Sequence, residues 1–381
     1  MKGRQIILDM DREASRAALM VDGVLQDLLI DGPGPDVGAI SWAKVDRVVP
    51  GLSGAFVTLS KENQGFLREA KGVKAGQGIL IQVTGFAEPG KATPVTRRVL
   101  YKGRRLIHTP DAPGINISRQ IRDPDERARL TEALEDWMPD PASCEPPAAG
   151  HYTQMHQTGG VIVRTAAQGT RAEDLRREYG WLLAERAERE ASRGDLGPVL
   201  AIDYALREWT AEPVDLITYG PRAEDYVYGP LNLERLSCPE IEERLRLSDT
   251  KDPFEALGIW EQIQSLNTPL SSGGSMVVEA TRALVAVDVN TQGNFSQGAA
   301  MTTNIEACRE LPRQLRLRGL GGQIVVDFAP LKKAHRKKIE EVLKAAFRKC
   351  PVETTLAGWT PLGNLELQRK RERRPLDPRK I

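Results

Sequence analysis

Two apolar segments in the last third of the chain each end in a single aspartate. In residues 284–290 successive side chains of a strand would point to opposite faces, which puts Leu284, Ala286, Asp288 and Asn290 on one face and three valines on the other. Residues 322–327 form a second Val/Ile-rich segment, and its last residue is Asp327. The stretch between the two segments has the length of a long helix and is rich in arginine. The pattern predicts two strands connected by a helix, with one carboxylate at the end of each strand.

Aspartates in these positions are typical of a cation site. A carboxylate at the end of an apolar strand is costly to bury unless a cation or hydrogen-bond donors meet it. In open α/β sheets, ligands bind in the crevice outside the carboxyl ends of the strands. Oxygen ligands from Asp288 and Asp327 on neighbouring strands would suit Mg²⁺, with Mn²⁺ as a substitute. The alternative is that each aspartate only caps the turn or helix that follows it, but Asn290 on the same face as Asp288 favours the metal site.

The first 110 residues follow a different pattern, in which short strands alternate with turns. Residues 5–10 and 16–30 read as two strands, and the Gly- and Pro-rich segment 31–39 then breaks the pattern. Residues 40–109 contain about five brief strands separated by glycines. Such a series predicts a small β-barrel rather than a β-α-β unit.

Composition limits the remaining possibilities. With 381 residues the chain is long enough for two or more domains. The formal net charge is only +1, so any contact with nucleic acid must come from local clusters of basic residues. The four cysteines are scattered along the sequence and no two of them form a Cys-x-x-Cys pair, which argues against a disulfide framework and a zinc knuckle. No apolar segment has the length of a signal-peptide core or of a membrane span, so we expect a cytoplasmic protein.

The C-terminal third also resembles the catalytic region of the ribonuclease E/G family of bacterial endoribonucleases. The shared motifs are Ser-Gly-Gly-Ser, Asp-x-Asn, Asn-x-Glu-Ala, Arg-Gln-Leu-Arg-Leu-Arg, Leu-Gly-Gly and Asp-Phe, at residues 272–275, 288–290, 304–307, 313–318, 320–322 and 327–328. The resemblance implies that Asp288 and Asp327 hold the catalytic Mg²⁺, and Asn290 would orient a metal ligand or the attacking water. On the helix between the two strands, Arg313, Arg316 and Arg318 are candidates for contacts with RNA phosphates, although Arg316 and Arg318 cannot face the same way.

The resemblance further implies a multidomain α+β and α/β fold. An OB-fold RNA-binding barrel would be inserted into a ribonuclease-H-like subdomain, and a DNase-I-like catalytic subdomain would follow. The expected ranges, in chain order, are 1–34 for the first part of the ribonuclease-H-like subdomain, 35–110 for the barrel, 111–194 for a 5′-phosphate-sensor-like region, 195–268 for the second ribonuclease-H-like part and 269–381 for the catalytic subdomain. Family members commonly continue into a zinc link and a small dimerisation domain; this sequence resembles a short form without them. No zinc is therefore expected, while a homodimer is compatible with the sequence.

The barrel supplies the candidate RNA contacts. Phe56 and Phe66 would be stacking platforms for bases, and Lys91 is among the basic residues that would contact phosphates. The alternative for a phenylalanine in a barrel strand is the hydrophobic core.

A second set of residues resembles the family's pocket for the 5′ monophosphate of RNA. Arg119, Arg164 and Thr165 would form it, since arginine and a hydroxyl suit a phosphate. The alternative for Arg164 is a salt bridge to the acidic helix that follows it. Gln120 stands where the family usually has a second arginine, and Glu353 lies near the expected position of a further one, which weakens the case for strong 5′-end sensing.

The expected function is therefore Mg²⁺-dependent cleavage of single-stranded RNA, such as mRNA or rRNA precursors, leaving 5′-phosphate and 3′-hydroxyl ends. A non-catalytic RNA-binding or assembly protein with the same fold is the main alternative. A metal-dependent phosphoesterase acting on DNA is a third.

Overall fold

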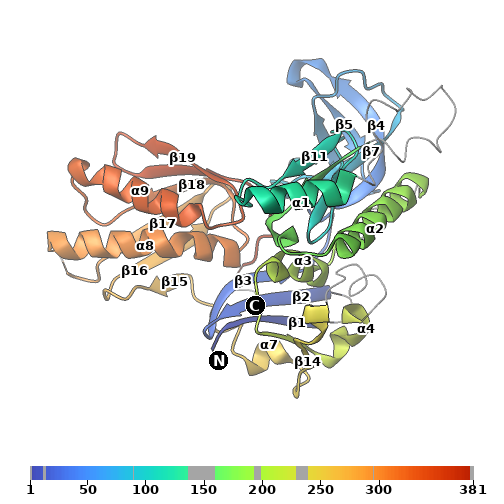
Figure 1. Ribbon diagram of the computed structural model, residues 1–381. Coiled ribbons are helices and arrows are strands. Elements are labelled where there is room, and N and C mark those ends of the chain that lie inside the picture. The colour runs from blue at the N-terminus through green and yellow to red at the C-terminus, as the bar shows by residue number, and fades with distance from the viewer. Residues whose placement is uncertain are drawn as a thin grey trace.

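A computed structural model describes residues 2–11, 14–88, 90–135, 159–192, 199–228, 239–294 and 296–377. Figure 1 shows an N-terminal sheet at the bottom, a barrel at the upper right, and a C-terminal sheet with two long helices at the left. Among these residues no helix has the length and apolar character needed to span a membrane.

The N-terminal sheet combines two segments that are far apart in the sequence. Its strand order is β14-β13-β1-β2-β3, and β1 runs parallel to β13. The strands are β1 (Arg4–Asp11), β2 (Ala14–Val21), β3 (Val24–Ile30), β13 (Leu216–Tyr219) and β14 (Leu245–Leu247). Helix α3 (Ala201–Glu208) packs on one face and α7 (Pro253–Ala256) on the other, which explains why β1 is buried on both faces.

One detail of this sheet differs from the prediction. The segment 16–30 was expected to be one strand, but it is part of a hairpin of two strands, β2 and β3. Asp22 and Gly23 form the turn with positive φ angles of 50° and 79°. Asp-Gly is the sequence that a two-residue hairpin with two positive φ angles favours.

The barrel confirms the predicted series of short strands. It closes in the order β4-β5-β6-β8-β7. Its strands are β4 (Ile40–Val49), β5 (Gly54–Thr58), β6 (Gln64–Arg68), β7 (Gly78–Val83) and β8 (Thr93–Thr96). Alternate residues such as Val45, Val57 and Leu67 fill the interior. The barrel strands end at Thr96, earlier than the expected boundary at residue 110.

The next two strands belong to a separate four-stranded sheet with the order β11-β12-β10-β9. Its elements are β9 (Tyr101–Lys102), β10 (Leu106–Thr109), β11 (Gly114–Ile117) and β12 (Gly160–Val163), with α1 (Pro124–Glu135) and α2 (Ala172–Ala191) packed on it. Two short helices near the N-terminal sheet are α4 (Glu224–Val227) and α6 (Pro239–Glu242).

The C-terminal sheet has six strands in the order β15-β16-β17-β18-β20-β19. They are β15 (Asn267–Pro269), β16 (Ser275–Ala280), β17 (Val285–Asn290), β18 (Gly322–Asp327), β19 (Thr354–Trp359) and β20 (Leu365–Arg369). Helices α8 (Gln297–Leu317) and α9 (Arg336–Phe347) cover one face, where Val285, Val287 and Val289 are buried. The alternate residues of β17 and β18 point to the other face, and the polar ones among them are exposed. The predicted strand-helix-strand unit is thus present, with one covered and one open face.

Candidate active site

The fold brings Asp288 and Asp327 side by side. Strands β17 and β18 are parallel neighbours, and the two aspartates are direct register partners. Neighbouring strands lie about 4.8 Å apart, so one small cation could contact both carboxylates. Both side chains are exposed on the open face, and neither forms an ion pair within the described residues. The carboxylates therefore avoid the cost of burial by facing solvent, and their charge is not neutralised by an arginine or lysine.

Asn290 lies on the same open face, two residues after Asp288. Its Nδ2 donates a short hydrogen bond to Oδ2 of Asp288. This contact engages one oxygen of the Asp288 carboxylate. The structure thus brings together the three candidate catalytic residues that the sequence analysis selected.

The loop before β16 is fixed against α8 close to Asn290. The backbone N–H of Ser272 donates to Glu306 at 2.9 Å, and the Ser272 and Thr303 hydroxyls lie 3.1 Å apart. A Cβ atom at Gly274 would lie 2.5 Å from Thr303 Cγ2 and 2.7 Å from the carbonyl oxygen of Asn290. Only glycine allows this close approach, which accounts for the glycine at that position of the Ser-Gly-Gly-Ser motif.

The loop after Asp327 is fixed by a different residue of the same helix. Asn304 is fully buried, donates to the Ala329 carbonyl at 2.9 Å and accepts from the Ala329 N–H at 3.0 Å. Helix α8 therefore holds the chain at the carboxyl ends of both β17 and β18. Asn304 lies in the Asn-x-Glu-Ala motif, but no local pattern in the sequence indicates its function. Its side chain acts on a residue 25 positions further along the chain, and only the structure shows that pairing.

The donor set fits Mg²⁺. This ion prefers oxygen ligands and is commonly held by one or two carboxylates, with waters and substrate phosphates completing an octahedral shell. Asp288 and Asp327 supply the carboxylates on an open face that a phosphodiester can approach. In the described part of the chain, no group of three or more His, Cys, Asp or Glu side chains is placed to enclose a metal.

The three candidate arginines of α8 have other partners. Arg313 donates to the Leu25 carbonyl at 2.6 Å, and Arg316 donates to the Gln26 carbonyl at 2.6 Å. Arg318 is 2% exposed and donates to the Val278 carbonyl at 3.0 Å. The first two bind backbone oxygens of β3, the edge strand of the N-terminal sheet, and so join the two sheets. These contacts favour a structural function for all three arginines over the expected phosphate contacts.

The two candidate stacking residues lie outside the barrel core. Phe56 and Phe66 are register partners on β5 and β6, half-buried, with ring centroids 5.2 Å apart. Their neighbours Val57 and Leu67 point inward instead. Arg47 stacks on Phe56 at 4.8 Å from the ring centroid. Neither ring belongs to the interior cluster of the barrel, and base stacking on them stays a prediction.

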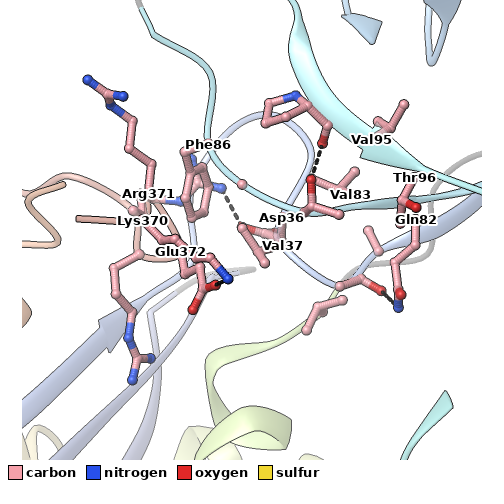
Figure 2. Close-up of a pocket in the computed structure, with 18 of the residues that line it drawn as sticks. Asp36, Val37, Gln82, Val83, Phe86, Val95, Thr96, Lys370, Arg371 and Glu372 are labelled. Carbon is pink, nitrogen blue, oxygen red and sulfur yellow. Dashed lines mark hydrogen bonds and ion pairs between the residues drawn. The ribbon is translucent and has the colours of Figure 1, made fainter. Parts of the chain in front are cut away.

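A groove of about 1430 Å³ connects this aromatic surface with the C-terminal segment. Figure 2 shows Gln82 and Thr96 of the barrel on one side and Lys370, Arg371 and Glu372 on the other. Lys91 also lines the groove, although it forms an ion pair with Glu88 at 2.5 Å. Arg371 binds the same carboxylate at 2.9 Å. Both walls of the groove therefore carry basic side chains.

The candidate 5′-phosphate residues are only partly available. Arg164 donates to the Gly103 carbonyl at 2.8 Å and forms an ion pair with Glu208 of α3. Burial favours a higher pKa for Glu208, but Arg164 and Arg207 outweigh it and lower the pKa below its usual value. Arg164 thus has the salt bridge that was its alternative interpretation, though to α3 rather than to the helix after it.

Thr165 and Arg119 lie on the exposed side of the same region. The Thr165 hydroxyl donates to Gln120 Oε1 at 3.0 Å and lies 3.2 Å from the Ser118 hydroxyl. Arg119 is exposed and has no ion pair among the described residues. Gln120, which stands in place of the second arginine, therefore accepts the hydrogen bond of the Thr165 hydroxyl that would otherwise be available to a phosphate.

A second group of aspartates lies at the N-terminal sheet, with Asp9 on β1 and Asp252 at the start of α7. Asp9 is fully buried and binds Arg16 at 2.6 Å and Arg222 at 2.9 Å. Arg16 also binds Asp252 at 2.5 Å. Arginines therefore neutralise these carboxylates, and the group is a structural ion-pair network.

Comparison with known proteins identifies the family of the chain. The ribonuclease E/G family model matches residues 101–372. Ribonuclease G of Salmonella typhimurium (strain SL1344) is 27% identical over 98% of this chain and 81% of its own length, and ribonuclease G of Escherichia coli (strain K12) gives the same values. Ribonuclease E of Escherichia coli (strain K12) is 30% identical over 97% of this chain and 37% of its own length. The chain therefore belongs to the ribonuclease E/G family.

Proposed function

We propose that this protein is a Mg²⁺-dependent endoribonuclease that cuts single-stranded RNA on the open face of the C-terminal sheet. Family membership supports the enzyme class. The observation that carries the site assignment is the register pairing of Asp288 with Asp327, exposed and without a basic partner in the described chain. Mn²⁺ would substitute for Mg²⁺ because it accepts the same oxygen ligands.

The reaction is the hydrolysis of one phosphodiester bond. A water oxygen bonds to phosphorus, the bond from phosphorus to the 3′ oxygen breaks, and that oxygen leaves as a hydroxyl after taking up a proton. The phosphate stays on the 5′ carbon of the downstream product. When bound, Mg²⁺ would supply positive charge to the non-bridging oxygens and make the attacking water more acidic.

The protein's own residues position the reacting groups. Asp288 and Asp327 would hold the ion, and the Asn290 amide orients Asp288 through its hydrogen bond. Asn304 keeps the chain after Asp327 in place. A site held by such supporting contacts loses little free energy to reorganisation during the reaction.

RNA would approach through the groove between the barrel and the C-terminal segment. Phe56 and Phe66 would stack on bases, and Lys91 would contact phosphate after release from Glu88. We propose that the barrel is an OB-fold domain, that the N-terminal sheet is ribonuclease-H-like, and that the C-terminal sheet with α8 and α9 is DNase-I-like. An assignment to mRNA or rRNA precursors, a cytoplasmic location and a homodimer remain predictions from the sequence.

The test is a cleavage assay on a 5′-labelled single-stranded RNA with Mg²⁺ or with chelator. We expect internal cleavage that requires Mg²⁺ and is lost in Asp288→Asn. Glu279→Gln is the matched control, because Glu279 is an exposed carboxylate on the same sheet, paired with Ala286 of β17. It should cleave normally. RNA binding without cleavage by the unaltered protein would instead establish a non-catalytic RNA-binding protein. Equal cleavage of a DNA strand would establish a metal-dependent phosphoesterase that acts on DNA.

A further inference from the structure

A dense group of cations follows the second candidate metal ligand. After β18 the chain continues into a short 3₁₀ helix (Lys333–His335) and then α9. We call Lys332, Lys333, Lys337 and Lys338 the α9 lysine cluster. All four are exposed, and none of them forms an ion pair within the described residues.

The cluster lies at the same edge of the sheet as Asp327. Helix α9 packs back along the covered face through Ile339, Leu343 and Phe347, so its first turn lies beside the carboxyl end of β18. The connecting loop is held by Asn304 at Ala329. An RNA strand crossing the metal site toward this edge would pass the lysines.

The charges are unfavourably placed for the helix itself. The first turn of α9 contains basic residues and no acidic residue. The N-terminal end of a helix carries a partial positive charge, which favours anions and disfavours cations there. Lysines at this end therefore cost stability in the free protein, and an anion bound among them would relieve the repulsion.

Aromatic contacts connect the cluster to the residue after Asp327. The Arg336 guanidinium stacks on Trp359 at 4.7 Å from the ring centroid, and the Trp359 ring lies 5.9 Å from Phe328. Trp359 Nε1 also donates to Glu340 of α9 at 2.8 Å. The start of α9 is thus fixed relative to Asp327 by packing and by hydrogen bonding, so the lysines are presented at a defined place.

We propose that the α9 lysine cluster binds the phosphates that flank the scissile one, on the strand held at Asp288 and Asp327; this rests on the proposed function. A run of exposed ammonium groups suits a run of phosphates, and lysine contacts to phosphate carry no base preference. The cluster therefore contributes to RNA affinity and to placement of the strand. It takes no part in the chemical step.

The test compares two double variants that remove the same charge from the two ends of one helix. Lys337→Gln with Lys338→Gln neutralises the first turn. Arg348→Gln with Lys349→Gln is the control, since both residues are exposed beyond the C-terminal end of α9 and form no ion pair in the described chain. Single-stranded RNA binding is measured by fluorescence anisotropy as a function of salt, and steady-state cleavage is measured in parallel.

We expect the first variant to raise KM about tenfold with kcat unchanged. The plot of log association constant against log salt concentration should become less steep by about 1.4, or about 0.7 for each lost phosphate contact. The control should match the unaltered protein. Removal of cations from the first turn should leave the melting temperature unchanged or higher, so weaker binding could not be attributed to unfolding. Equal RNA affinity in the two double variants, or a loss confined to kcat, would overturn the proposal.

The binding measurement is repeated with Asp288→Asn in both double variants. If no cleavage is ever detected, the anisotropy comparison still tests the cluster by itself. A failed nuclease and a failed lysine site therefore give different results.

Discussion

Two groups of aspartates on two different sheets have opposite surroundings in this protein. In the N-terminal sheet, Asp9 is fully buried and bound by Arg16 and Arg222. In the C-terminal sheet, Asp288 and Asp327 are exposed, and no described basic side chain pairs with them. Asp9, Asp288 and Asp327 all lie on strands, so the strand position alone does not make a metal site. What differs is whether an arginine or a cation from solution can balance the negative charge.

The buried ion pairs contribute to stability, whereas the exposed pair is the proposed site of the chemistry. A buried ion pair that loses one partner leaves an uncompensated charge inside the protein. An exposed carboxylate pair has little effect on folding, but it offers adjacent oxygens to a divalent ion. The same Asp→Asn change should therefore have different consequences at the two places.

The largest effect is expected at the exposed pair. Asp327→Asn should lower kcat by about 10³-fold or more, since metal-assisted charge stabilisation is worth several kcal/mol and each 1.36 kcal/mol is tenfold in rate. The free energy of unfolding should change by less than about 0.5 kcal/mol, as is usual at exposed positions. Single-turnover cleavage and urea denaturation measure the two quantities. A fold that collapses in this variant would contradict the assignment.

Asp9→Asn should show the reverse pattern. We expect a loss of about 3 kcal/mol in the free energy of unfolding, because Arg16 and Arg222 lose the charge that balances them. Cleavage by the folded fraction at low temperature should remain within about twofold of normal, because a tenfold change needs 1.36 kcal/mol in the reaction barrier and Asp9 lies outside the candidate site. Strong loss of kcat without loss of stability would mean that the N-terminal sheet takes part in catalysis.

An intermediate effect is expected where α8 supports the exposed pair. Asn304→Ala removes two hydrogen bonds and leaves the N–H and C=O of Ala329 unpaired, which should cost about 2 kcal/mol of stability. If the loop after Asp327 shifts, kcat should fall about tenfold with KM little changed, since small displacements of catalytic groups are costly. Asn304→Asp should lose at least as much stability, because a buried carboxylate oxygen would face the Ala329 carbonyl oxygen. Loss of stability without loss of kcat in Asn304→Ala would show that Asn304 does not position the site.

The smallest effect concerns another arginine that is neutralised by a carboxylate. Glu208→Gln should free Arg164 from its ion pair and let it contact the 5′ end of RNA. Since partly exposed pairs are worth about 0–1 kcal/mol, we expect the preference for 5′-monophosphorylated over 5′-hydroxyl RNA to increase by no more than about fivefold. A cleavage assay in which the two RNAs compete measures this preference. No change would indicate that Arg164 is structural in both forms.

The sequence predicted the local parts of the site and missed its long-range supports. Strict alternation in residues 284–290 correctly placed Asp288 opposite the buried valines, because side-chain direction in a strand depends only on position. The partners of Arg313 and Arg316 are carbonyls of β3 that lie 288 and 290 positions earlier in the chain, and no local pattern identifies them. The turn at Asp22 and Gly23, by contrast, has a local signal in its Asp-Gly sequence, although the apolar pattern continues through it.

The central claim is that the cation binds at Asp288 and Asp327 and not at the aspartates of the N-terminal sheet. The most direct test replaces Mg²⁺ with Fe²⁺, generates hydroxyl radicals with ascorbate and peroxide, and maps the resulting backbone breaks by mass spectrometry. We predict breaks clustered at the ends of β17 and β18, suppressed by excess Mg²⁺ and absent in Asp288→Asn. Breaks clustered around Asp9 and Asp252, or a pattern that Asp288→Asn leaves unchanged, would contradict the claim.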